Sequence, residues 1–112
     1  MTVQIKKTYQ DINPEMLRDE ARDLIKKHGI TVGEAKLQTY ALPSGSTQSR
    51  ITMVLKAGGE ECGNAHIIGS PEGETKLMVD LDEKLLPQES ISSLQKDLDF
   101  ILGSYEVRWS LS

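Results

Sequence analysis

Apolar and polar residues alternate along much of the chain, and this alternation predicts β-strands. Residues 2–9, TVQIKKTY, place Val3, Ile5, Lys7 and Tyr9 on one side of an extended chain, the pattern of a half-buried strand. Further strand-like runs cover residues 33–42, 49–57, 62–68, 75–82 and 104–112. The four middle runs are joined by short connections, so we expect neighbouring strands there to be antiparallel.

Two segments have the spacing of amphipathic helices. In residues 11–29, Asn13 is suited to cap the helix, Pro14 to occupy its first position and Gly29 to end it. The second segment covers residues 87–103 and ends at Gly103. The predicted core-facing stripes comprise Leu17, Ala21, Leu24, Ile25 and His28 in the first helix, and Ile91, Leu94, Leu98, Ile101 and Leu102 in the second.

The resulting order, β-α-β-β-β-β-α-β, predicts an α+β protein that forms a two-layer α/β sandwich. Each helix has one apolar stripe, so both helices are expected on one face of a mixed, largely antiparallel six-stranded sheet. Each terminal β-α-β unit should cross over with right-handed connectivity. A runner-up is a strongly curved sheet that grips the C-terminal helix around a cavity. Residues 1–112 are expected to form a single globular domain.

A glycine-rich stretch, residues 57–69, holds the single cysteine and one of the two histidines. A three-residue loop at residues 58–60 would place Ile51, Met53 and Leu55 opposite Ile67, Ala65 and Gly63, an apolar set that can face the helices. In that register Cys62, Asn64 and His66 lie on the other face of the sheet. A two- or four-residue loop would instead bury these polar residues against the helices, where they would need hydrogen-bond partners.

The charge balance argues against a broad affinity for phosphate backbones or anionic lipid. The formal net charge is −4, and the only basic doublets are Lys6–Lys7 and Lys26–Lys27. Few aromatic residues are present to stack on bases. A membrane partner is therefore not expected, and nucleic-acid or nucleotide binding through Lys6, Lys7, Lys26 and Lys27 ranks third, after the two functional hypotheses given below. The single cysteine and the lack of a long apolar segment favour a cytoplasmic protein.

No catalytic constellation, metal site or cofactor motif is predicted. Cys62 and His66 would be about 13 Å apart in a strand, too far to act on one atom. His28 lies at a helix C-terminus, which stabilises a histidine through the helix dipole. The acidic run Asp80, Asp82 and Glu83 is typical of a solvated strand end, because it lacks the further oxygen ligands of a cation site.

The uncovered face of the sheet is the candidate binding surface. Tyr40, Leu42, Val54, Ile68 and Met78 fall on this face, and they form an apolar patch if their strands are neighbours. The predicted binding residues are Tyr40, Val54, Asn64, His66 and Met78.

The leading functional hypothesis is a module that works by binding another protein, or itself, through this face or an unpaired edge strand. The alternative is a small-molecule-binding protein or enzyme. Its pocket would lie between sheet and helices, with polar contacts from His66, Tyr40 or Asn64.

Overall fold

A computed structural model describes residues 2–69 and 73–106. Along the chain the elements are β1 (Thr2–Gln10), α1 (Pro14–Lys26), β2 (Thr31–Val32), β3 (Lys36–Ala41), β4 (Thr47–Ala57), β5 (Glu60–Gly69), β6 (Glu74–Asp82) and α2 (Gln88–Leu102). The predicted fold class is confirmed, since two helices pack against a six-stranded sheet whose described strand pairs are all antiparallel.

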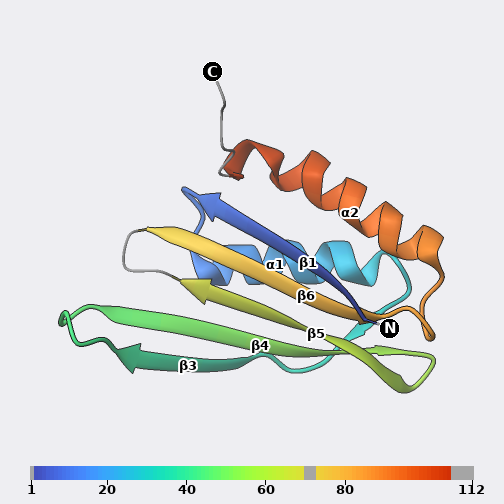
Figure 1. The fold of residues 1–112 in the computed structure, drawn as a ribbon, viewed down its shortest axis with the longest axis horizontal. Helices are drawn as coiled ribbons and strands as arrows, with labels where there is room; N and C mark the ends of the chain where they lie inside the picture. The colour runs from blue at the N-terminus through green and yellow to red at the C-terminus, as the bar shows by residue number, and fades with distance from the viewer. Residues whose placement is uncertain (1, 70–72, 107–112) are drawn as a thin grey trace.

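The strands lie in the order β1-β6-β5-β4-β2, and β3 also pairs with β4. β2 and β3 therefore share the outer side of β4. The strand predicted at residues 33–42 covers β3 but not β2. α1 connects strands at opposite edges of the sheet and crosses behind it, whereas α2 runs alongside β1 (Figure 1). One edge of the sheet is thus close to a helix, and the β3 edge is far from α2 (Figure 1).

The predicted strand at residues 104–112 falls mostly outside the described residues. Within them, Gly103–Tyr105 form a short 3-10 helix, and Glu106 makes an isolated antiparallel bridge with Tyr9. The chain after α2 therefore returns to β1, the strand that pairs with β6. Residues 107–112 are not described.

Local sequence explains both ends of α1. The Asn13 side-chain oxygen accepts a hydrogen bond from the Met16 amide at 2.8 Å, and Pro14 is the first helical residue. Gly29 has a φ of 76°, a left-handed conformation that costs glycine little. These three predictions are confirmed.

The core lies between the helices and one face of the sheet. It contains the predicted stripe residues except His28, which is half-buried, and Ile101, which is 42% exposed, so the prediction that Ile101 is buried is wrong. The strands contribute Ile5, Tyr9, Ile51, Met53, Leu55, Ala65, Ile67, Leu77, Val79 and Leu81.

The β4–β5 hairpin has the predicted register but a different turn. Ile51, Met53 and Leu55 pair with Ile67, Ala65 and Gly63, as predicted. The loop has two residues instead of three, because Gly58 and Gly59 both adopt positive φ, at 61° and 84°. A bulge between Leu55 and Lys56 restores the register.

The bulge changes the position of Cys62. Without a direct partner on β4, its side chain turns into the core, where it is 1% exposed. The expectation that Cys62 lies on the open face is therefore wrong. Gly63 has no room for a side chain, because a Cβ there would overlap the Asp80 carbonyl oxygen of β6.

Candidate functional site

The predicted binding residues lie on the sheet face opposite the helices. Val54, Asn64, His66 and Met78 alternate with buried residues of β4, β5 and β6, so their side chains point away from the core. Val54 is opposite Asn64, and His66 is opposite Met78. Tyr40 pairs with Gln48 near the far end of the hairpin. Polar residues thus separate Tyr40 and Val54 from Met78.

His66 has a modest local partner. Its Nδ1 atom lies 3.4 Å from the Thr52 hydroxyl oxygen, on the neighbouring strand. No carboxylate among the described residues is hydrogen-bonded to His66. Because His66, Tyr40 and Asn64 face away from the helices, they cannot line a pocket between helices and sheet, and that placement is wrong.

Cys62 has the properties of an inert buried thiol. Burial raises the pKa of its thiol, and the negative charges of Asp82 and Glu61 raise it further. The nucleophilic thiolate is therefore disfavoured. Cys62 points into the core while His66 points away from it, so the two side chains do not form a catalytic pair.

Asp80 and Asp82 of β6 have structural partners. An Asp80 carboxylate oxygen accepts a hydrogen bond from the Gln4 side chain at 2.8 Å, and an Asp82 oxygen accepts one from the Lys84 amide at 2.9 Å. Among residues 2–69 and 73–106, no group of three His, Cys, Asp or Glu side chains could hold a metal ion.

His28 joins the two helices. Its Nε2 atom lies 2.8 Å from an Asp97 carboxylate oxygen of α2. The interaction connects the residue just after the C-terminal end of α1 to α2. This partner is distant in sequence and could not be identified from the chain alone.

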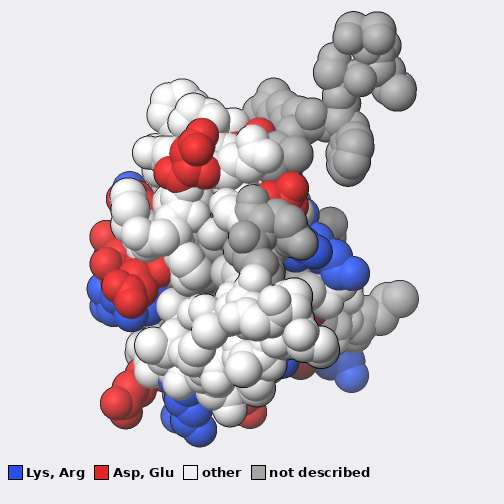
Figure 2. All heavy atoms as spheres, turned by 90° about the vertical axis from the view of Figure 1, so that its left-hand side faces the viewer, with Lys and Arg blue, Asp and Glu red and all other residues white. Residues whose placement is uncertain are grey.

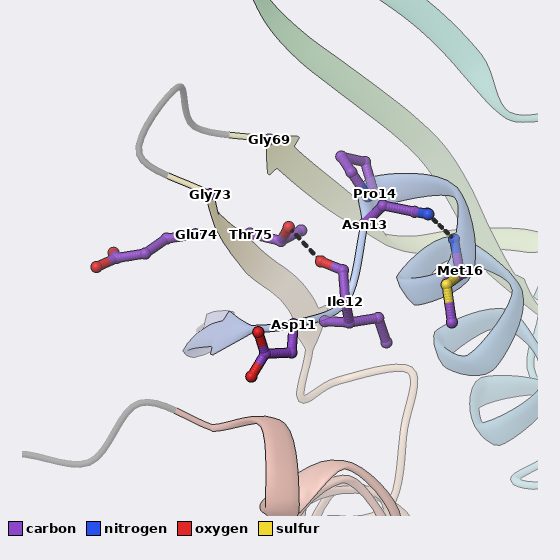
Figure 3. Close-up of a pocket in the computed structure, with 9 residues that line it drawn as sticks. All are labelled: Asp11, Ile12, Asn13, Pro14, Met16, Gly69, Gly73, Glu74 and Thr75. Carbon is purple, nitrogen blue, oxygen red and sulfur yellow. Dashed lines mark hydrogen bonds between the residues drawn. The ribbon is translucent and has the colours of Figure 1, made fainter.

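A shallow cavity of about 410 Å³ lies where β1 leads into α1 (Figure 3). Its main polar groups have partners within the fold: Thr75 donates a hydrogen bond to the Ile12 carbonyl at 2.7 Å, and Asn13 caps α1. Glu74 points away from the other labelled side chains (Figure 3). The cavity therefore offers few free groups to hold a polar ligand.

A second cavity, of about 260 Å³, lies on the helix side of β3. It is lined by Leu37 and Ile51, which are cross-strand partners, by Ser49, and by the first residues of α1, Asn13, Pro14 and Glu15. This hollow joins the exposed Leu37 side chain to the edge of the core.

Charged groups from α2 and the segment after it cover the β1 edge of the sheet. The Lys7 ammonium lies 2.8 Å from an Asp99 carboxylate oxygen and 3.2 Å from one of Glu106. The hydrogen bond with Asp99 is the largest cause that raises the pKa of Lys7. Beside it, burial raises the pKa of Tyr9, whose side chain is fully buried.

The β3 edge is bare by comparison. All six residues of β3 are exposed, with Leu37 at 57% and Tyr40 at 43%. Residues 37–49 comprise most of β3, the turn and the start of β4, and they include no Lys, Arg, Asp, Glu or His. At this end of the molecule a broad surface of uncharged side chains is visible (Figure 2). The absence of charge from residues 37–49 is the signal in the sequence that could have indicated this surface.

Comparison with known proteins gives no matching family model, no matching curated protein and no matching solved structure. No helix in the described part of the chain is long and apolar enough to cross a membrane. Functional inference therefore depends on the geometry of the molecule itself.

Proposed function

We propose that this protein is an interaction module that associates with a second copy of itself by pairing the two β3 edges. The observation that carries the proposal is the exposure of every residue of β3, beside a stretch, residues 37–49, that has no charged side chain. Among the described residues, β3 pairs with β4 alone. Its outer backbone groups are therefore open to another strand.

In proteins that stay monomeric, edge strands are normally protected against pairing with another chain. Lysines, prolines, bulges or inward-pointing charges prevent a second strand from adding to the sheet. Between Leu37 and Ala41 β3 has none of these, and its pairing with β4 is regular. Lys36 and Pro43 lie just outside this stretch. The outer edge of β3 therefore lacks the usual barriers to strand addition.

A second copy is a suitable partner because antiparallel pairing of one strand with itself is symmetric. A twofold axis through Thr39 would place Thr39 opposite Thr39 of the second copy and Leu37 opposite Ala41 of the second copy. The two Lys36 side chains would then be roughly 20 Å apart along the strands, beyond the screening length of physiological salt. No like charges oppose this pairing.

The second copy would also cover apolar surface on the helix side. Leu37 and Ile51 line the cavity beside β3, and strand addition would bring the second copy across its mouth. Main-chain hydrogen bonds along an edge, supplemented by side-chain contacts in a hollow, are the usual basis of strand addition. The contact is small, so we expect a weak dimer, with a dissociation constant in the micromolar range or above.

Sedimentation velocity tests the proposal over protein concentrations from about 10 μM to about 1 mM, the range of a weak dimer. The unmodified protein should sediment increasingly as a dimer. Thr39→Lys places an inward-pointing charge on the edge and should keep the protein monomeric. Ser44→Lys adds the same charge in the β3–β4 turn and should leave the dimer intact. A protein that stays monomeric throughout, or an equally dimeric Thr39→Lys variant, would contradict the proposal.

A further inference from the structure

The open face of the sheet has an ordered arrangement of basic residues. Strand pairing defines two neighbouring cross-strand rows that run from β3 to β1. The first row contains Lys36, Thr52, His66, Met78 and Lys6, and the second contains Gln38, Arg50, Ile68, Lys76 and Thr8. Neither row contains a carboxylate.

Each of the five strands that the rows cross contributes one basic side chain to them. In sheet order they are Lys36, Arg50, His66, Lys76 and Lys6, and they alternate between the first and second row. We name this set the basic strip. The four Lys and Arg residues are exposed, and none forms an ion pair with another described residue. Their charges are therefore open to an external anion.

Carboxylates lie on both sides of the basic strip. On β6, Asp80 and Glu74 stand two residues beyond Met78 and Lys76 respectively. These carboxylates would repel an anionic chain that ran parallel to the strands. An anionic chain is therefore best accommodated across the strands, between the two rows of basic residues. Five strands at about 4.8 Å spacing give such a chain a path of roughly 19 Å.

The chemistry of the basic strip favours an acidic polypeptide over nucleic acid. Sheet surfaces that bind single-stranded nucleic acid stack its bases on aromatic side chains. The two rows contain no Phe, Tyr or Trp, and Tyr40 lies outside them. Ile68 and Met78 are half-buried at the centre, where aliphatic parts of a peptide can pack. An extended peptide of about six residues matches the path length.

We infer that the basic strip binds an extended acidic segment of another polypeptide, laid across the open face from β3 to β1. The protein's own charge of −4 makes non-specific attraction to such a segment unfavourable, so binding depends on this local arrangement. The inference does not rest on the proposed dimer, because the basic side chains lie on the face of the sheet and strand addition uses its edge.

Fluorescence anisotropy with labelled octaglutamate tests the inference, in about 50 mM salt to limit screening. The triple variant Lys6→Gln, Arg50→Gln, Lys76→Gln should bind the peptide about tenfold more weakly, since each exposed pair contributes modestly. The matched control Lys26→Gln, Lys27→Gln, Lys96→Gln removes the same charge from exposed helical positions. This control should bind octaglutamate as well as the unmodified protein. Thr39→Lys, the variant expected to stay monomeric, should also bind it as well, because binding does not depend on the dimer.

Two results would overturn the inference. The first is the absence of octaglutamate binding, or an equal loss of binding in the control, which would exclude a localised site. The second is tighter binding of labelled octathymidylate than of octaglutamate, with loss in the strip variant, which would assign the surface to nucleic acid. Circular dichroism of both triple variants verifies that the substitutions preserve the fold.

Discussion

The two edges of the sheet differ in how far the rest of the chain covers them. At the β1 edge, Ile5 and Tyr9 are buried, and Lys7 is paired with Asp99 and Glu106 from the C-terminal part of the chain. At the β3 edge, every residue is exposed and Leu37 has no comparable cover. One edge is thus built into the core, and the other is exposed.

The difference follows from connectivity as much as from composition. α2 and the residues after it follow β6, which is the neighbour of β1, so they are well placed to cover the β1 edge. β3 is connected by short links to β2 and β4, and neither link supplies a covering element. An edge left uncovered in this way is a site where another strand can add, unless charges, prolines or bulges protect it.

The largest difference between the edges should appear when the same apolar side chain is truncated at each. Ile5 is 3% exposed and Leu37 is 57% exposed, and both point to the helix side of their strands. Ile5→Ala should lower the free energy of unfolding by about 3 kcal/mol, through lost burial and a new cavity. Leu37→Ala should change it by less than about 0.5 kcal/mol.

Urea denaturation at a protein concentration low enough to keep the chain monomeric measures both variants. Similar losses at the two positions would mean that Leu37 is covered in the monomer, which contradicts the comparison.

Alkaline pH should weaken the β1 edge. Burial first, then the negative charges of Glu106 and Asp99, raise the pKa of Tyr9, and the hydrogen bond to Asp99 raises that of Lys7. The unfolded chain releases these protons near their ordinary pKa values while the folded protein retains them. Stability is therefore complete below about pH 10 and falls above it, by about 1.4 kcal/mol per pH unit for Tyr9. Lys7 adds a smaller decline in the same direction, because water partly screens its ion pairs.

Tyr9→Phe isolates the contribution of the phenol. Its hydroxyl has no hydrogen-bond partner among the described residues, so the substitution should cost little at neutral pH. Denaturation series at several pH values should show a shallower alkaline decline in Tyr9→Phe than in the unmodified protein. Identical declines would show that Tyr9 does not retain its proton in the folded state.

The smallest expected effect concerns the lysines of the two edges. Lys7→Gln removes contacts with two carboxylates and should lower the free energy of unfolding by about 0.5–1 kcal/mol, since Asp99 is half exposed and the pair is partly screened by solvent. Lys36→Gln removes an unpaired charge and should have no measurable effect. Equal effects in urea denaturation would indicate that the charges at the β1 edge do not stabilise it.

Much of this fold could be predicted from the sequence because its signals are local. The cap at Asn13, the stop at Gly29 and the pairing of Ile51 with Ile67 each depend on a few neighbouring residues. Ile101 fits the helical stripe of α2 yet points outward, because its burial depends on how the helix rotates against the sheet. The bulge that buries Cys62 likewise results from tertiary packing that the glycine-rich stretch alone does not specify.

The candidate surfaces were less predictable, because they too depend on tertiary structure. The sequence correctly placed Val54, Asn64, His66 and Met78 on one face, but it could not order the strands. The basic strip exists only because strand pairing places its members on five neighbouring strands; they are Lys6, Lys36, Arg50, His66 and Lys76. Likewise, the sequence does not show that β3 has a neighbouring strand on one side only. This follows from the strand order of the described sheet.

Amide hydrogen exchange, measured residue by residue at low and high protein concentration, tests the central contrast between the two edges most directly. The account predicts that amides on the outer side of β3 exchange quickly in dilute protein and become protected as concentration rises, while those of β1 keep the same protection throughout. Exchange at β3 that is independent of concentration would contradict the claim that this edge pairs with a second copy.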